Sequence, residues 1–222
     1  MQKQESKKQT NTLIKWILAT IILVTLIIGG AFISGTFYPN VWTVEKIEAE
    51  VHKKELNQVK LLGLREPEFE YTDKTSFLLA TSKCVEYLNY TTDRLSRVPT
   101  SIIIAMAGVE SGWGTSRFAN EGNALFGVRT WDLKNVAHMK AKGNPDASWG
   151  VKKYKTKCQS VHDMIKILNR HPAYKEFRIE REKQLDSGKW NYRTLMVLMN
   201  AWSTNPDYHE IILQAIVDNK LP

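Results

Sequence analysis

A glutamate ends an almost uncharged stretch of this sequence, in a position suited to acid catalysis. Residues 98–109 read VPTSIIIAMAGV, and Glu110 follows as the first charged residue. We expect this carboxyl group to be buried against apolar neighbours, and both burial and the negative end of a helix dipole disfavour an ionised carboxylate. A carboxyl group that keeps its proton near neutral pH can act as a general acid. Glu110 is therefore the candidate catalytic residue, and the competing interpretation is a helix-ending surface glutamate that points to water or pairs with Arg117.

Several motifs in the same order resemble a known enzyme family. They are ESGWGTS (residues 110–116), NALFG (123–127), LNRHPAY (168–174) and NAWSTNPDY (200–208). Together they resemble the glucosaminidases of glycoside hydrolase family 73, especially the Bax-like branch, from about residue 95 to residue 221. The resemblance implies a lysozyme-like fold and an endo-β-N-acetylglucosaminidase that cleaves peptidoglycan at the β-1,4 bond after N-acetylglucosamine. It also implies that Glu110 is the catalytic acid.

Two positions depart from the pattern of that family. Trp202 stands where a tyrosine is usual, which keeps an aromatic face and loses a hydroxyl group. Gly150 stands where the Bax-like branch often carries a glutamate, on the last strand of the β-lobe. Asp146, in the turn before that strand, is then the candidate second catalytic residue, with Asp132 as an alternative, although aspartates are common in turns for structural reasons. Without either, the substrate's own acetamido group would act as nucleophile with Glu110 alone, or the enzyme would be slow or inactive.

The sugar-binding candidates follow from the shape of sugar rings, whose apolar C–H faces stack on flat aromatic side chains. These candidates are Trp113, Phe126, Trp149, Trp202 and Tyr208, and for each the alternative is packing in the core. Ser116 and Asn123 are expected either to fix the loop after the helix or to bind an N-acetyl group. The 5 histidines show no paired metal spacing, so we expect no metal and no cofactor.

Two other functions fit part of the pattern. A lytic transglycosylase also uses a single glutamate, but its usual GLMQ-like segment is replaced here by NALFG. A non-catalytic, membrane-tethered protein for wall binding or envelope assembly would account for Gly150 and Trp202. The net charge of +8 suits an anionic partner such as peptidoglycan or a membrane surface. We expect no nucleic-acid binding, because no dense basic stripe with interleaved aromatics is present.

The elements that must position these residues form a mainly helical α+β domain, expected over residues 73–222. Asp73 is a candidate N-cap for a helix to about Asn89. Pro99 is expected to open a second, largely buried helix that ends after Glu110. The second helix would then place Glu110 at the cleft that the lysozyme-like resemblance implies.

The second half of this domain begins with residues 124–156, which predict a small antiparallel sheet of two or three strands. Ser160 with Asp163 resembles a capping box, and so predicts a helix from there. Residues 191–201 predict a further helix, and residues 205–207 (Asn-Pro-Asp) predict the start of the last one.

The N-terminal part of the chain reads as a membrane anchor. Residues 16–33 carry no charge and would span about 27 Å as a helix, close to the ~30 Å of a hydrocarbon core. We expect a cytoplasmic tail (1–12), a transmembrane signal anchor (13–37) and an exported remainder on the periplasmic or cell-wall side, because lysines precede the span. The alternative is a signal peptide cleaved near residues 29–31.

The segment between anchor and domain, residues 38–72, is expected to hold a membrane-proximal helix and a linker. Its helix, residues 43–60, has a thin apolar stripe suited to a partner in an envelope complex. The sequence also contains two cysteines, Cys84 and Cys158. Outside the cytoplasm they can form a disulfide, or they can be two separate buried thiols.

Overall fold

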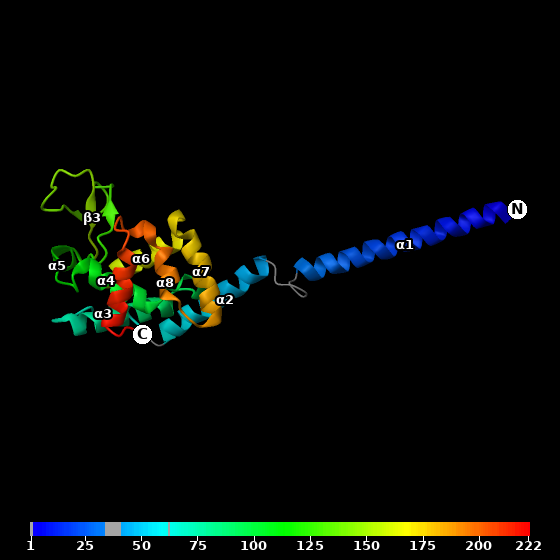
Figure 1. Cartoon of the computed structure of the whole chain (residues 1–222). Coiled ribbons are helices and arrows are strands. Elements are labelled where there is room, and N and C mark those ends of the chain that lie inside the picture. Colours follow the sequence, from blue (N-terminus) through cyan, green and yellow to red (C-terminus); the bar gives the residue numbers. More distant parts are fainter. Residues whose placement is uncertain (1, 34–40, 62) are drawn as a thin grey trace. The chain divides into compact units, whose positions relative to one another are not determined.

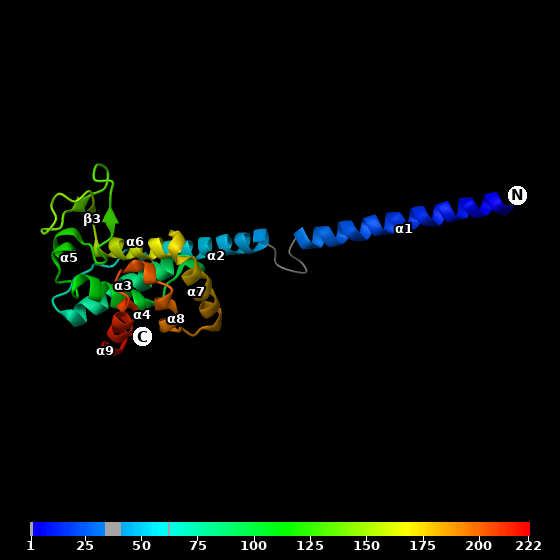
Figure 2. The same ribbon diagram turned by 45° about the horizontal axis from the view of Figure 1, so that its top comes forward.

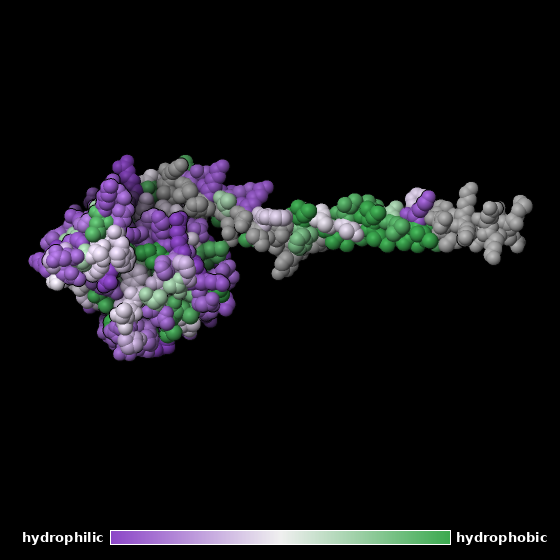
Figure 3. All heavy atoms as spheres, turned by 90° about the horizontal axis from the view of Figure 1, so that it is seen from above, coloured by the Kyte–Doolittle hydropathy of each residue, from purple (hydrophilic) through white to green (hydrophobic). Residues whose placement is uncertain are grey.

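The computed structural model describes residues 2–33, 41–61 and 63–222 and divides into two compact units, Met1–Lys54 and Glu55–Pro222. In the first unit, α1 (Gln2–Ile33) contains an apolar candidate membrane span, Leu13–Ile33. Length and composition alone identify this span, and Figure 3 shows its apolar side chains along α1. The expected end of the anchor at residues 34–37 lies outside the described residues. The helix expected over residues 43–60 is confirmed as α2 (Val41–Leu61).

The core of the second unit is built around two predicted helices, and both are confirmed. In α3 (Lys74–Thr91), Asp73 is the N-cap, and its carboxylate accepts from the backbone N–H of Ser76 at 2.7 Å. Next comes α4 (Thr100–Ser111), with Pro99 at its N-cap. Its apolar residues are buried on all sides because α4 packs between α3 and α9 (Tyr208–Asp218).

The β-lobe is a three-stranded antiparallel sheet with strand order β1-β3-β2, which confirms the expected small sheet. Its strands are β1 (Arg129–Thr130), β2 (His138–Met139) and β3 (Gly150–Lys152). In this register Thr130 lies opposite Gly150, and His138 lies opposite Lys152. Figures 1 and 2 show the lobe at one end of the helical unit, beside α5 (Arg117–Gly122).

Of the remaining elements, one precedes α4 in the sequence and the others follow the sheet. They are η1 (Arg94–Ser96), α6 (Lys157–Arg170), η2 (Pro172–Tyr174), α7 (Lys175–Ser187), α8 (Tyr192–Val197) and η3 (Asn200–Trp202). The single helix expected over residues 191–201 is therefore split into α8 and η3. The last helix begins at Tyr208, so Pro206 precedes it and does not occupy its first turn.

The expected capping box at Ser160 is wrong. Thr156 is the N-cap of α6, and its hydroxyl accepts from the backbone N–H of Gln159 at 3.1 Å. Ser160 is instead buried, and its hydroxyl accepts from the backbone N–H of Leu125 at 3.0 Å. This bond fastens the NALFG segment to α6, because a buried backbone N–H needs a partner.

Cys84 of α3 and Cys158 of α6 are joined as a disulfide, with their Cα atoms 5.6 Å apart. We expect replacement of both cysteines by alanine to lower the free energy of unfolding by about 2–5 kcal/mol, because the bond restricts the unfolded chain. Urea unfolding with and without a reductant measures this. The reductant should destabilise the wild type and leave the double variant unchanged. An equal response of the two proteins would show that the bond does not form.

Candidate active site

Glu110 stands at the rim of a cavity because of how α4 ends. Gly112 follows the helix in the left-handed conformation, with φ of 59°, and its N–H donates to the carbonyl of Gly108. A left-handed residue at this place is a common helix terminator that glycine adopts without strain. The hydroxyl of Ser111 donates to the carbonyl of Ala107 and accepts from the N–H of Gly114 at 2.8 Å. The last turn of α4, and Glu110 on it, is therefore held from both sides.

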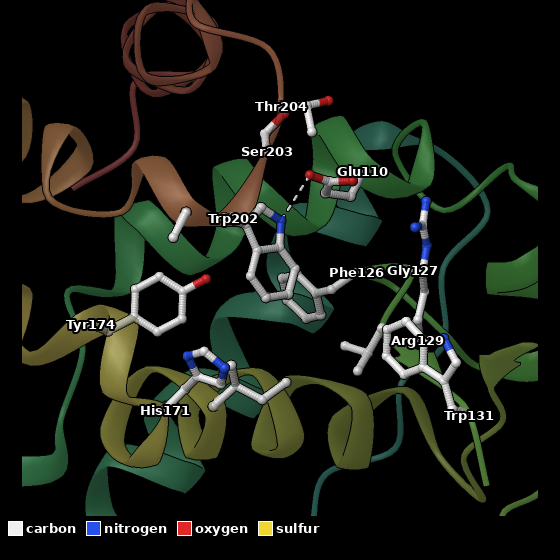
Figure 4. A pocket seen from close by; sticks show the side chains of 13 residues that line it. Glu110, Phe126, Gly127, Arg129, Trp131, His171, Tyr174, Trp202, Ser203 and Thr204 are labelled. Atoms are coloured by element: carbon white, nitrogen blue, oxygen red, sulfur yellow. Dashed lines mark hydrogen bonds between the residues drawn. The ribbon is translucent and has the colours of Figure 1, made fainter. Parts of the chain in front are cut away.

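The cavity beside Glu110 has a volume of about 560 Å³. Its walls come from the last turn of α4, the segment that leads into β1, α6 with η2, and η3 with the residues after it. The other residues that line it are Phe126, Gly127, Val128, Arg129, Trp131, Ile167, His171, Tyr174, Ala201, Trp202, Ser203 and Thr204. Figure 4 shows the Glu110 carboxylate pointing toward Trp202, with Phe126 behind the indole.

Glu110 is exposed, so the expected burial of its side chain is wrong. Its Oε1 accepts a hydrogen bond from the indole Nε1–H of Trp202 at 3.1 Å. Pairing with Arg117 is wrong as well, because Arg117 donates to Glu121 at 3.2 Å and to the carbonyl of Lys140. One carboxylate oxygen is thus fixed by Trp202, and the other is left to meet a molecule in the cavity.

Tyr208 lies close to Glu110 at the start of α9, and the residue is 7% exposed. Burial, and then the negative charge of Glu110, raise the pKa of this tyrosine. The hydroxyl makes no hydrogen bond of ordinary geometry with any described residue. Tyr208 does not line the cavity, so its place is beside the carboxylate and not on the wall that a sugar would touch.

The aromatic wall of the cavity contains two of the expected residues, Phe126 and Trp202. It also contains two that sequence reasoning did not single out, Tyr174 and the 66% exposed Trp131. Tyr174 stands in the LNRHPAY motif, which was a usable signal for it and for His171. Trp131 lies in no such motif. An exposed tryptophan next to a short strand has no sequence pattern that indicates a place in the cavity.

Trp113 lies outside this cavity and supports the turn after α4. It lines a separate hollow of about 570 Å³ together with Lys74 and Val109. One side of its ring lies on Gly108, where an added Cβ would approach Cζ3 to 2.2 Å. The ammonium of Lys74 lies 4.0 Å from the ring centroid. With Gly108 and Lys74 against it, the indole packs as part of the fold.

Ser116 and Asn123 hold the loop that follows α4 and do not line the cavity. Ser116 is the N-cap of α5, and its hydroxyl accepts from the N–H of Ala119 at 3.2 Å. The Asn123 side chain donates to the carbonyls of Tyr154 and Lys155 at 3.1 Å and 3.0 Å. Of the two expected roles, this geometry matches the fixing of the loop.

Glu110 is the one carboxylate among the described residues that line the cavity. Asp146 is exposed in the turn before β3 and is not a lining residue. The carboxylate of Asp132 accepts from the backbone and the side chain of Asn135, and these bonds lower its pKa. At Gly150, an added Cβ would lie 2.6 Å from Cδ2 of His138, so His138 occupies the space that a larger side chain would need.

Trp149 also lies outside the lining residues, but it contacts one of them. The guanidinium carbon of Arg129 lies 4.1 Å from the centroid of the Trp149 ring. Trp149 therefore packs against a residue that lines the cavity and does not line it itself.

Comparison with known proteins places this geometry in context. Residues 90–221 match the family model "Glucosaminidase: Mannosyl-glycoprotein endo-beta-N-acetylglucosaminidase". The chain is 30% identical over 132 residues to protein bax of Escherichia coli (strain K12), a match that covers 58% of this chain and 45% of that protein. It is 29% identical over 126 residues to exo-glucosaminidase LytG of Bacillus subtilis (strain 168), covering 53% and 43%. The chain thus spans less than half the length of these relatives.

A solved structure has the same fold. The catalytic domain of the autolysin Auto from Listeria monocytogenes matches with a TM-score of 0.51 at 18% sequence identity. The match covers 75% of this chain and 94% of that domain. At this level of identity the likeness concerns the fold, and the predicted helical domain with a small β-lobe is confirmed.

Proposed function

We propose, because this chain belongs to the glucosaminidase family, that it hydrolyses peptidoglycan at the β-1,4 bond that follows N-acetylglucosamine. The observation that carries the proposal is Glu110 at the rim of the cavity of about 560 Å³, hydrogen-bonded to Trp202 and accompanied by aromatic side chains. Aromatic rings suit the apolar faces of a sugar, and a carboxyl group with one free oxygen suits proton transfer to a glycosidic oxygen. Phe126, Trp131, Tyr174 and Trp202 are the proposed sugar contacts.

In the proposed reaction, Glu110 first acts as an acid. Trp202 holds Oε1, and Oε2 delivers a proton to the glycosidic oxygen as the bond from the anomeric carbon to that oxygen breaks. The carbonyl oxygen of the substrate's acetamido group attacks the anomeric carbon, which forms a cyclic oxazolinium intermediate. Water then attacks the same carbon and gives its proton to the Glu110 carboxylate, which regenerates the acid. One bond is hydrolysed, and the configuration at the anomeric carbon is retained.

Tyr208 is proposed as a positioning residue for this carboxyl group. Its buried hydroxyl has no hydrogen-bond partner among the described residues and lies close enough to feel the charge of Glu110. A buried hydroxyl without a partner is costly, and a small movement of Glu110 would satisfy it. Trp202 and Tyr208 would then both donate to Oε1, which leaves Oε2 for the proton transfer.

A second carboxylate is not needed by this route. We expect Asp146→Asn to leave the rate of hydrolysis within about twofold, because surface substitutions away from a site have small effects. Turbidity clearing of purified peptidoglycan measures it, with Asp132→Asn beside it. A loss of tenfold or more in either variant would assign that aspartate as the second catalytic group and replace the substrate-assisted route.

Product analysis tests the proposed reaction. Purified peptidoglycan is digested with the chain, and the fragments are identified by mass spectrometry. Fragments with N-acetylglucosamine at the reducing end are expected, whereas anhydro-muramic ends would identify a lytic transglycosylase. The name of LytG indicates an exo-acting relative, so the lengths of the fragments also show whether cleavage here is internal or terminal.

The second candidate function is non-catalytic wall binding. It is favoured by the single carboxylate in the cavity and by the small Gly150 with His138 beside it. A protein of this kind would sediment with purified peptidoglycan and release no fragments from it. The same digest therefore separates the two candidates.

We also propose that the catalytic domain is exported and tethered through α1. The candidate span Leu13–Ile33 follows lysines that favour a cytoplasmic N-terminus, and the disulfide suits an oxidising compartment. Val44, Ile47 and Val51 of the apolar stripe on α2 are exposed, and an envelope partner is the proposed contact for this stripe. Protease digestion of intact and of permeabilised cells tests the orientation. The protease cuts the domain only in a compartment that it can reach, so the treatment that first allows cutting shows on which side of the membrane the domain lies.

A further inference from the structure

The cavity beside Glu110 contains one permanent positive charge among the described residues that line it, the guanidinium of Arg129. Glu110 is the matching single carboxylate. A neutral N-acetylated glycan needs no cation in the cavity to bind. Peptidoglycan differs from a neutral glycan because its stem peptides carry carboxylates, as do the lactyl groups of muramic acid residues that bear no peptide, and Glu110 would repel them unless a cation were close.

Arg129 is held in a defined orientation without being neutralised. Its backbone lies in β1, opposite Val151 of β3. Its guanidinium lies over the Trp149 ring, 4.1 Å from the centroid, and the carbonyl of Trp149 accepts from the ammonium of Lys140 at 3.1 Å. Stacking uses the flat face of a guanidinium and leaves its N–H edge for a carboxylate, which two parallel hydrogen bonds can bind.

No described residue supplies that carboxylate. Arg117 pairs with Glu121 and Arg193 pairs with Glu210, whereas Arg129 has neither an ion pair nor a hydrogen bond within the described part of the chain. Figure 4 shows its side chain on the wall formed by the β-lobe, extending to the level of Glu110, with Trp131 beside it. The N–H edge is therefore available where a bound glycan would lie.

We propose that Arg129, supported by Trp149, binds a carboxylate of the substrate and makes the cavity selective for an anionic glycan. This inference rests on the proposed function and adds a specificity-determining residue to it. The carboxylate is either an acid of the stem peptide or the lactyl group of a muramic acid residue that bears no peptide. Both have the same chemistry and would bind through the same bidentate contact.

The test uses one substrate in two charge states. Purified peptidoglycan is compared with the same material after its carboxylates have been converted to amides with a carbodiimide and ammonia. The wild type should lose about tenfold or more in kcat/KM on the amidated material, since a hydrogen bond to a charged group is lost. Arg129→Gln should be about tenfold slower than the wild type on the native substrate and equally active on both.

Controls make each outcome decisive. Arg94→Gln removes an exposed arginine that pairs with Asp186 and should behave as the wild type. Arg129→Lys keeps the charge without the planar fork and should recover part of the preference. The inference is overturned if the wild type cleaves both substrates equally, or if Arg129→Gln keeps the preference. If the wild type releases no reducing-end N-acetylglucosamine from either substrate, the proposed function itself has failed.

A third substrate shows whether the bound carboxylate belongs to the lactyl group or to the stem peptide. An amidase hydrolyses the amide bond between the lactyl group and the stem peptide, so the glycan strands that it leaves carry free lactyl carboxylates and none of the peptide's. If amidation of these strands still slows the wild type and not Arg129→Gln, Arg129 binds the lactyl group. If it slows neither, the bound carboxylate belongs to the stem peptide.

Discussion

Glu110→Gln is expected to lower kcat for peptidoglycan hydrolysis by about 10³-fold, because acid–base catalysis by a positioned side chain contributes about 10²–10⁴-fold. Glutamine keeps the size of glutamate and an oxygen that can accept from Trp202, but its amide is not acidic enough to transfer a proton. Binding to purified peptidoglycan should remain close to that of the wild type. Clearing assays give kcat, and sedimentation with peptidoglycan measures binding.

The matched control is Glu121→Gln, which changes the same residue type at an exposed site. Glu121 pairs with Arg117 on the surface of the described part of the chain, and such pairs contribute little. This variant should clear peptidoglycan at the rate of the wild type. If Glu110→Gln keeps more than a tenth of the wild-type rate, Glu110 is not the catalytic acid.

The second large effect is expected at Trp202, whose indole N–H holds the Glu110 carboxylate. Trp202→Phe keeps an aromatic face and loses the donor, so kcat should fall about tenfold with KM little changed, as expected for a hydrogen bond to a charged group. Trp202→Ala also loses the apolar contact with sugar, and kcat/KM should fall about 100-fold. Steady-state hydrolysis of soluble glycan strands separates the two parameters.

Trp202→Tyr serves as the rescue variant for this position. A tyrosine hydroxyl donates a hydrogen bond and keeps the ring, so Trp202→Tyr should be faster than Trp202→Phe. If Trp202→Phe equals the wild type in kcat, the bond from Trp202 to Glu110 has no part in catalysis. Thermal unfolding of each variant checks that a loss of rate is not a loss of fold.

The helix that carries Glu110 could be predicted from sequence, because its signals are local. The run of apolar residues in α4 permits only a buried element, and Gly112 ends the helix through its own left-handed conformation. Asp73 similarly caps α3 through atoms within three residues. A helix cap or helix end whose partners lie within one turn of the chain can therefore be predicted from the sequence.

Ser160 shows why other elements were harder to predict. Its spacing to Asp163 fits a capping box, but its hydroxyl is used by the N–H of Leu125, 35 residues away. No local pattern records such a bond, so Thr156 was not recognised as the cap. The exposure of Glu110 was missed for a related reason, since a helix end is covered or left open by segments that are distant in sequence.

The cavity could be predicted only in part. Phe126 and Trp202 were found because they stand in family motifs, and both line it. Arg129 and Trp131 belong to the β-lobe. Because the position of this lobe relative to α4 depends on the whole fold, neither residue could be assigned to the cavity from the sequence. Trp113 was expected to stack on sugar because it follows Glu110 closely, but the left-handed turn at Gly112 places it against Gly108 instead.

The most direct test of the account is a digest of purified peptidoglycan in water enriched in oxygen-18, with wild type and Glu110→Gln in parallel. The account predicts that wild-type fragments end in reducing N-acetylglucosamine with one heavy oxygen incorporated, and that Glu110→Gln releases about 10³-fold less of them. Unlabelled anhydro ends from the wild type, or equal release by the two proteins, would contradict it.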